Sequence, residues 1–566
     1  MGGLKGMKMA EEEKNYIDVP DQGLFFVPLG GVGEIGMNFY LYACDGSWIA
    51  VDCGVGFAGD RFPGIDMLMP DPAFAEKIAP KLKGMIVTHA HEDHIGAVAS
   101  FWPLLRCPVF VSAFAAEMLE ARLDESGLLG RVDIHLFEPG DLLELFPFEI
   151  ESVAMNHSIP ESCSLLIKTP YGALFHTGDW RFDAAPVIGA PVDLKTIKTL
   201  KNEKIMALIG DSTNVFVEGD IPSETDVKEA LTELFADYKD RRLIVTCFAS
   251  NVGRIESIAE AAEKNGRTVC LLGRSLWRVE GAGRAAGYFR GINVFLTEEE
   301  AAECDPGSIL YLCTGCQGEP KAALSNISYG TGPVKPVKGD VVVFSSRVIP
   351  GNEQAIANIQ NRFISKGIEI VTGKDALVHV SGHCGRRDME KLYTFLKPKT
   401  AVPVHGEAAH LYEHADLARA CGVQNAVILK DGDVLRLDTS VPEIIGEVQT
   451  GILARDRKQI IPLNAGILKQ RRRMIDDGTV VATVVLDKTG NLVGDVQFSA
   501  VGLIAANDPV LSQMNAAVQL ELSGLSGADR RENDQAVFDT VKAAVRHVVM
   551  ETHGRRPLVD VHLVRI

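Results

Sequence analysis

The sequence predicts an α/β protein of several domains. A chain of 566 residues is too long for one core, and length alone predicts about three to four domains. Up to about residue 222, short apolar runs alternate with turns rich in Gly, Pro and Asp, which is typical of strands buried in a sheet. From Ser223 onward such runs alternate with helical patterns, which favours a mostly parallel α/β domain.

Composition and the N-terminus narrow the class of protein. Hydrophobic residues make up 46% and charged residues 23% of the chain, as in ordinary globular proteins. No apolar run approaches the roughly 18 residues of a membrane helix, and the first residues lack the apolar core of a signal peptide. We therefore expect a flexible tail over 1–20, no membrane association and a cytoplasmic location.

The cysteines and the net charge bear on the environment and the partners. There are eleven cysteines, and Cys247 and Cys270 lie in apolar runs, which predicts reduced, buried thiols. The lone pair Cys313 and Cys316 is weak evidence for zinc. A net charge of −18 argues against nucleic acid as a partner unless a groove is locally basic or carries metal cations.

The chain divides at changes of pattern. Ser223 is a plausible N-cap with Asp226 three residues on, so an inserted domain begins there. The window 455–473 is the most basic of the chain. It is interpreted as a solvated linker, with a contact to RNA or to a second subunit as the alternative. The expected parts are a tail (1–20), a first domain (21–222) with its continuation (384–452), an insertion (223–383), a basic linker (453–474) and a small α/β domain (475–566).

The strongest chemical signal is HxHxDH over 89–94, directly after the strand-like run GMIVT. Imidazole and carboxylate suit zinc, manganese and similar divalent ions. Placing these groups at the end of an apolar strand costs free energy unless a bound metal offsets their desolvation. The motif holds the candidate ligands His89, His91, Asp93 and His94.

Four further polar residues end apolar runs elsewhere: Asp52, His157, Asp179 and His405. Open α/β sheets place ligands at strand ends, so these side chains can converge with the motif. Each alone is more often structural, but together with HxHxDH they favour a metal site.

Two other motifs favour no site. Residues 31–36 fit GxGxxG, but the run after them predicts a strand and not the helix of a dinucleotide site. His410 and His414 fit HxxEH, but no third ligand is evident nearby.

The order Asp52, HxHxDH, His157, Asp179 resembles the metallo-β-lactamase superfamily. Asp211, His383 and His405 resemble three motifs of its β-CASP nucleases. PLGGVGEIGMN (28–38), TGCQGEP (314–320), IPGNE (349–353) and HVSGH (379–383) resemble bacterial RNase J. The resemblance implies an αββα sandwich with an inserted α/β β-CASP domain and a small α/β C-terminal domain.

The resemblance also implies roles for the site residues. His89, His91 and His157 would hold one divalent metal, and Asp93, His94 and His405 another, with Asp179 bridging. Asp52 would orient a ligand histidine through its other ring nitrogen. Zinc is expected, with manganese as the alternative.

Two-metal chemistry predicts the reaction. The metals would clamp the scissile phosphate and lower the pKa of the attacking water from about 15.7 to roughly 7. Asp93 or Asp179 would orient or deprotonate this water, and His383 would protonate the leaving oxygen or stabilise the transition state. The resemblance also implies contacts to the RNA. His379, Ser381, Gly382 and His383 would bind phosphate oxygens, and Ser250 and Asn251 the 5′-monophosphate. Phe57, Phe62 or Phe248 would stack a base.

The resemblance implies a 5′→3′ exoribonuclease that prefers 5′-monophosphate RNA, with some endonuclease activity, in RNA decay and maturation. Its partners would be RNA, a homodimer or homotetramer, and possible RNA-degradation complex proteins. The alternatives are a hydrolase of DNA or of a small thioester on the same metal site, and an RNA-binding scaffold without catalysis.

Overall fold

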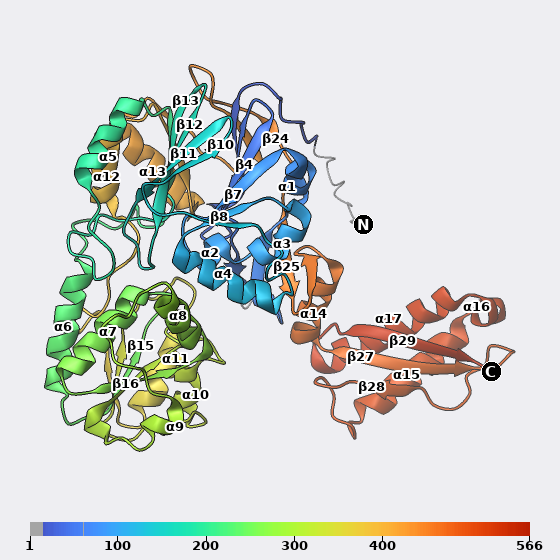
Figure 1. Cartoon of the computed structure of the whole chain (residues 1–566). Coiled ribbons are helices and arrows are strands. Elements are labelled where there is room, and N and C mark those ends of the chain that lie inside the picture. Colours follow the sequence, from blue (N-terminus) through green and yellow to red (C-terminus); the bar gives the residue numbers. More distant parts are fainter. Residues whose placement is uncertain (1–14, 60–61) are drawn as a thin grey trace. The chain divides into compact units, whose positions relative to one another are not determined.

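The structure is a computed structural model that describes residues 15–59 and 62–566. Residues 1–14 of the expected tail lie outside the described residues. The chain divides into two compact units, one formed by residues up to 57 with 67–452 and the other by 58–66 with 453–566. Figure 1 shows the elements of both units.

Two sheets form a sandwich within the first unit. We call these two sheets and their helices the sandwich lobe. One sheet has the order β24-β23-β1-β3-β4-β7-β8-β9 and the other β10-β11-β12-β13-β14-β20-β22. The strands of the first are β1 (Leu24–Gly30), β3 (Phe39–Cys44), β4 (Ser47–Val51), β7 (Leu82–Ile86), β8 (Val109–Val111), β9 (Ile134–Leu136), β23 (Asp433–Arg436) and β24 (Glu443–Glu447). Those of the second are β10 (Leu142–Leu145), β11 (Phe148–Ala154), β12 (Cys163–Thr169), β13 (Gly172–His176), β14 (Ala207–Asp211), β20 (Thr400–Val404) and β22 (Asn425–Ala426).

The strands of the sandwich are buried on both faces, so their sequences are almost continuously apolar. Phe26 of β1 packs between the sheets with residues of β12 and β14. Its neighbours Phe25 and Val27 point the other way, toward a core that includes helices. The helices are α1 (Ala73–Ile78), α2 (Glu92–Ile95), α3 (Val98–Leu105), α4 (Ala113–Glu125), α5 (Leu194–Thr199), α12 (Arg386–Leu396) and α13 (Ala408–Ala420). Shorter elements are β2 (Val32–Gly33), β5 (Gly56–Phe57), β6 (Met67–Pro70), β21 (Gly406–Glu407), η1 (Ala79–Lys81) and η2 (Leu200–Glu203).

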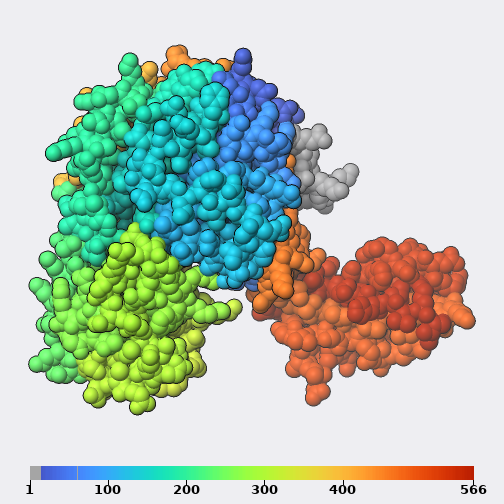
Figure 2. Space-filling view, in the orientation of Figure 1, coloured from blue at the N-terminus to red at the C-terminus, as the bar shows by residue number. Residues whose placement is uncertain are grey.

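The inserted lobe is a five-stranded parallel sheet with the order β16-β17-β15-β18-β19. Its strands are β15 (Leu243–Thr246), β16 (Thr268–Leu272), β17 (Ile309–Cys313), β18 (Val341–Phe344) and β19 (Glu369–Val371). Its helices are α6 (Glu224–Asp237), α7 (Val252–Lys264), α8 (Arg274–Ala285), α9 (Glu298–Ala301), η3 (Pro306–Ser308), α10 (Ala323–Tyr329) and α11 (Glu353–Ile364). Ser223 and Asp226 form the predicted capping box at the start of α6. Figure 2 shows the inserted lobe in green against the blue-to-cyan surface of the sandwich lobe, where Arg278 of α8 pairs with Glu125 of α4.

The insertion begins and ends at neighbouring strands. β14 and β20 pair in parallel, with Asp211 opposite Val404, although the whole inserted lobe separates them in sequence. Asp211 and His405 therefore lie at the carboxyl ends of two neighbouring strands of the second sheet.

The second unit has a three-stranded sheet, β28-β27-β29, in which β27 and β29 run parallel. The sheet packs on α15 and α17 through an apolar core. The window expected as a basic linker, 453–474, holds a β-hairpin and most of α14. The elements are β25 (Ile452–Asp456), β26 (Gln459–Pro462), α14 (Gly466–Asp477), β27 (Thr479–Leu486), β28 (Gln497–Ser499), α15 (Val510–Gly524), α16 (Gly527–Glu532), α17 (Asp534–His553) and β29 (Leu558–Arg565). Within 15–59 and 62–566, no helix has the length and apolar character needed to cross a bilayer.

Candidate metal centre

The predicted metal-ligand residues come together at the ends of strands in the sandwich lobe. HxHxDH follows β7 and enters α2, whose N-cap is His91. Asp52 follows β4 and His405 follows β20, both with left-handed backbone (φ 61° and 52°). Such conformations are costly for residues other than glycine and cluster at functional sites.

One group consists of His89, His91, His157 and Asp179. His91 Nδ1 lies 3.1 Å from His89 Nε2 and 3.0 Å from His157 Nε2. Asp179 Oδ2 lies 3.7 Å from each of those two Nε2 atoms. Three nitrogens and one carboxylate oxygen thus surround one point, as the ligands of a zinc-type site do.

A second group shares Asp179 and adds Asp93, His94 and His405. His405 Nε2 lies 3.0 Å from Asp93 Oδ2 and 3.7 Å from Asp179 Oδ1. His94 Nε2 lies 3.2 Å from Asp179 Oδ2. Asp179 therefore stands between the two groups, in the place that a bridging carboxylate requires.

Other side chains fix the rings of these histidines. Asp52, fully buried, accepts from Thr88 N at 2.8 Å and lies 2.7 Å from His94 Nδ1. Thr213 Oγ1 lies 2.7 Å from His405 Nδ1. When one ring nitrogen is held in this way, the other keeps its lone pair for a metal. Asp52 thus contacts the ring nitrogen of a candidate ligand, and nothing in the sequence pointed to Thr213.

The pKa values of the histidines shift in opposite directions in the two groups. Burial lowers the pKa of His89 and His157 well below the usual 6.5, and that of His91 to about 4. These rings are neutral at pH 7, which is the form that binds metals. Burial has the same effect on His405, but the carboxylates of Asp179 and Asp93 outweigh it and raise its pKa to about 9.

The donor set fits bound divalent cations. Asp179 is 1% exposed, and its Oδ1 has no hydrogen-bond partner within the described part of the chain. A buried carboxylate oxygen without a partner is costly, and a cation between the two groups would satisfy it. The arrangement is capable of binding metal and of placing positive charge at a phosphate.

His383 and Asp211 lie beside the two groups. Asp211 Oδ2 is 2.9 Å from His383 Nδ1, and Asp179 Oδ2 is 3.8 Å from the same nitrogen. Burial opposes protonation of His383, but Asp211 and Asp179 outweigh it and raise its pKa. A histidine held through Nδ1 keeps Nε2 for a substrate.

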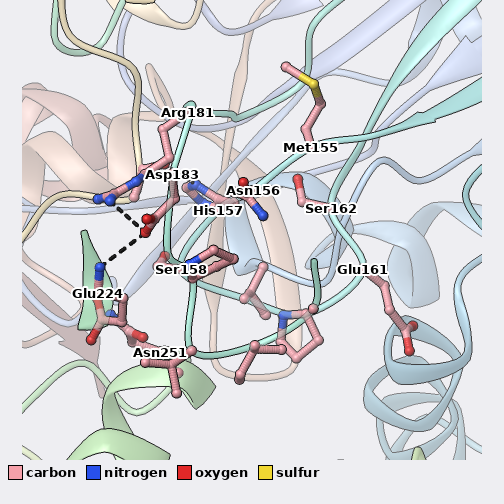
Figure 3. Close-up of a pocket in the computed structure, with 18 of the residues that line it drawn as sticks. Met155, Asn156, His157, Ser158, Glu161, Ser162, Arg181, Asp183, Glu224 and Asn251 are labelled. Atoms are coloured by element: carbon pink, nitrogen blue, oxygen red, sulfur yellow. Dashed lines mark hydrogen bonds and ion pairs between the residues drawn. The ribbon is translucent and has the colours of Figure 1, made fainter. Parts of the chain in front are cut away.

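Some of the other candidate RNA contacts line a cavity together with the ligand candidate His157. The carbonyl of Gly382 is 2.8 Å from His157 Nδ1, so Gly382 orients a candidate ligand. Asn251 caps α7 by accepting from Arg254 N. Asn251, Ser381 and Gly382 line a cavity of about 240 Å³ that His157 and Arg181 also line (Figure 3). Ser250 precedes Asn251, outside the residues that line the cavity.

The three base-stacking candidates belong to different parts of the chain. Phe248 packs near His379, with ring centroids 6.3 Å apart. Phe57 lies on β5 and is 73% exposed. Phe62 belongs to the second unit.

Within 15–59 and 62–566, neither HxxEH nor the pair Cys313 and Cys316 belongs to a candidate metal-ligand group. His414 of HxxEH is buried between Ser212 Oγ (2.9 Å) and Tyr393 OH (2.8 Å), so it serves the core. Cys313 and Cys316 are buried and unbridged. The run after GxGxxG is strand β3, as predicted.

Four family models match the chain. They are the Ribonuclease J beta-CASP domain over 240–363, the Ribonuclease J C-terminal domain over 466–566, a Zn-dependent metallo-hydrolase RNA specificity domain over 367–428 and a beta-lactamase superfamily domain over 47–246. These matches confirm the predicted fold class.

Relatives named Ribonuclease J match over most of the chain. The one from Sinorhizobium meliloti is 41% identical over 99% of this chain and 100% of its own length. Those from Synechocystis and Mycolicibacterium smegmatis are 35% and 34% identical, over 87% and 95% of this chain and 77% and 96% of their own lengths. A solved structure from Enterococcus faecalis, of unknown function, covers 73% of this chain and is itself covered in full, with a TM-score of 0.50 and 14% identity, which shows the fold alone.

Proposed function

The chain belongs to the RNase J family of β-CASP metal-dependent ribonucleases, and from that premise we propose that it degrades RNA from 5′-monophosphate ends in the 5′→3′ direction. The proposal includes internal cleavage of RNA as a second activity. The observation that carries the proposal is the pair of ligand groups that share Asp179, beside the segment 379–383.

Two divalent cations would occupy the two groups, with Asp179 as the shared ligand. When bound, they supply positive charge at the scissile phosphate and lower the pKa of the attacking water. Zinc is the proposed metal because the matched family is described as Zn-dependent; manganese suits the same donors.

The chain's own residues then orient the reactants. Asp93 and Asp179 are the carboxylates that can orient or deprotonate the attacking water, because both face the ligand groups. His383, held by Asp211 at Nδ1, offers Nε2 for protonating the leaving 3′-oxygen.

The 5′ end would be read near the N-terminus of α7 and the segment 379–383. A helix N-terminus carries positive partial charge and unpaired backbone N–H groups. His379, Ser381, Gly382, Ser250 and Asn251 are the proposed phosphate contacts, and Phe248 is the stacking residue, because it already packs near His379.

The setting of the enzyme is also part of the proposal. The eleven cysteines are all unbridged, which suits the reducing cytoplasm. The C-terminal domain of the matched family (466–566) is the proposed dimer or tetramer contact, and RNA-degradation proteins are proposed partners. Gel filtration with light scattering tests the oligomer, with a monomer at all concentrations as the contradicting result.

The experiment for the proposed function compares three forms of one labelled RNA, with 5′-monophosphate, 5′-hydroxyl or 5′-triphosphate ends. We expect mononucleotides released from the 5′ side, fastest from the monophosphate, and no activity for Asp179→Asn. Equal rates on the three ends would contradict the proposed recognition of the 5′-monophosphate. Hydrolysis of a thioester but not of RNA would favour the small-molecule alternative. RNA binding without RNA hydrolysis by the wild-type protein would favour the scaffold.

A further inference from the structure

The segment that carries His379, Ser381 and His383 is irregular, yet side chains hold its carbonyl groups. It lies between β19 and α12 and forms no strand or helix at 377–383. Val378 O accepts from Ser345 Oγ (2.6 Å) and Arg254 Nη1 (3.0 Å). Ser381 O accepts from Arg181 (2.6 Å), and His383 O from Asn214 (3.3 Å). Since a loop has no ladder to satisfy its backbone, these donors determine its position.

Arg254 of α7 is the most buried of these donors, at 0% exposure. Its Nε and Nη2 contact both oxygens of Glu224 at 2.6 and 3.0 Å. This two-point pair fixes the plane of the guanidinium. Nη1 is left pointing at the segment, where it lies 3.1 Å from His379 Nδ1.

That contact determines which nitrogen of His379 carries the proton. A guanidinium has only N–H donors and no lone pair to offer, so Nδ1 of His379 must accept. Burial, followed by the charges of Arg254 and Arg347, holds the pKa of His379 well below its usual value. The ring is therefore neutral with its hydrogen on Nε2.

A second buried arginine is tied to the first across the two lobes. Arg181 donates to Asp183 Oδ2 at 2.6 Å, and the same oxygen accepts from Glu224 N at 3.0 Å (Figure 3). Arg181 also donates to Pro222 O at 2.7 Å. A continuous set of contacts between charged residues thus runs from the loop after β13 to α7. We call it the charged chain, and its members are Arg181, Asp183, Glu224 and Arg254.

We propose that the charged chain is a positioning device for RNA hydrolysis: Arg254 fixes His379 as the tautomer that presents Nε2–H to a phosphate oxygen of the RNA, and Arg181 fixes the Ser381 carbonyl beside it. The inference deepens the proposed function and rests on it. In this proposal Arg254 and Arg181 act through the contacts that they make with the segment.

The experiment is a double-mutant cycle with the metal-loaded full-length protein and a 5′-monophosphorylated RNA. Arg254→Lys keeps a positive charge but loses the planar fork. It is expected to lower kcat/KM by about 10- to 100-fold, as changes to residues that orient functional side chains typically do. In a His379→Ala background the same change is expected to cost less than about twofold, because residues acting as one unit are not additive.

Controls separate positioning from folding. Arg242→Lys removes a comparable two-point pair, with Asp340, and is expected to leave kcat/KM within about twofold. RNA affinity of the metal-stripped variants gives a readout independent of turnover, and Arg254→Lys is expected to weaken it only when His379 is present. If Arg254→Lys does not fold, Glu224→Gln replaces it in the cycle, with the same expected non-additivity.

Equal fold losses from Arg254→Lys with and without His379 would overturn the inference. Asp179→Asn distinguishes failure of the positioning role from failure of the proposed function. If it is inactive while the cycle is additive, only the positioning role fails. If it remains as active as wild type, the proposed function fails first.

Discussion

Replacing Asp52 by asparagine tests how much the metal centre depends on a residue that binds no metal itself. The carboxylate is fully buried, accepts from Thr88 N and Thr88 Oγ1, and lies 2.7 Å from His94 Nδ1. Asn keeps the volume but offers only one oxygen. Its NH₂ group would face His94 Nδ1 and donate to it, so the ring proton would move to Nε2, where the metal should bind.

The magnitude follows from the contacts. A hydrogen bond to a charged group contributes about 1.5–3 kcal/mol, and loss of an orienting partner typically lowers metal affinity or activity about 10- to 100-fold. At about 1.4 kcal/mol per factor of ten, the latter corresponds to roughly 1.4–2.8 kcal/mol. The two figures agree, so we expect a loss of this size at the group containing His94.

Competition titration with a fluorescent chelator measures the affinity, and kcat/KM on RNA measures the consequence. Asp340→Asn is the matched control, because Asp340 is 3% exposed and pairs with Arg242 in the inserted lobe. Metal affinity within twofold of wild type in Asp52→Asn would refute the reasoning that Asp52 sets the tautomer of His94.

Three further changes test other parts of the account. Thr213→Val removes the hydroxyl 2.7 Å from His405 Nδ1 and should weaken metal binding about tenfold; chelator titration showing unchanged affinity would contradict this. Burial raises the pKa of Glu34 from 4.5 to about 7, so the folded state keeps a proton that the unfolded chain releases, and the free energy of unfolding should fall as pH rises through that window. Glu34→Gln should reduce this fall, which urea denaturation at pH 5 and pH 8 measures; an equal fall in both proteins would count against it. Ser223→Ala removes the N-cap of α6 and should cost about 1 kcal/mol of unfolding free energy, whereas no change in the urea midpoint would show that the cap does not stabilise the lobe.

The fold was predictable where burial dictates the residue pattern. Strands of the sandwich are buried on both faces, so runs such as 39–44 and 47–51 are apolar and easily found. The secondary structure of the window 455–473 was not predictable, because charge dominates its composition. In α14 only Leu468 is buried, so the helix is mostly solvent-facing and its sequence lacks the apolar stripe that predicts a packed helix.

The metal-ligand candidates were predictable because a compact motif of three histidines and an aspartate directly follows a strand. The residues that orient them were not. Thr213 and His405 are 192 positions apart, and Arg254 and His379 are 125 apart. Threonine and arginine are common residue types, so only the paired strands β14 and β20 and the packing of α7 reveal these contacts.

The central proposal is that two divalent cations sharing Asp179 are needed for RNA hydrolysis. Its most direct test is metal titration of the EDTA-stripped protein, followed by calorimetry and by RNA hydrolysis on the same samples. We predict two bound equivalents of divalent metal, RNA hydrolysis that returns with them, and loss of both for Asp179→Asn. Full RNA hydrolysis by the stripped protein, or two bound equivalents and wild-type turnover in Asp179→Asn, would contradict it.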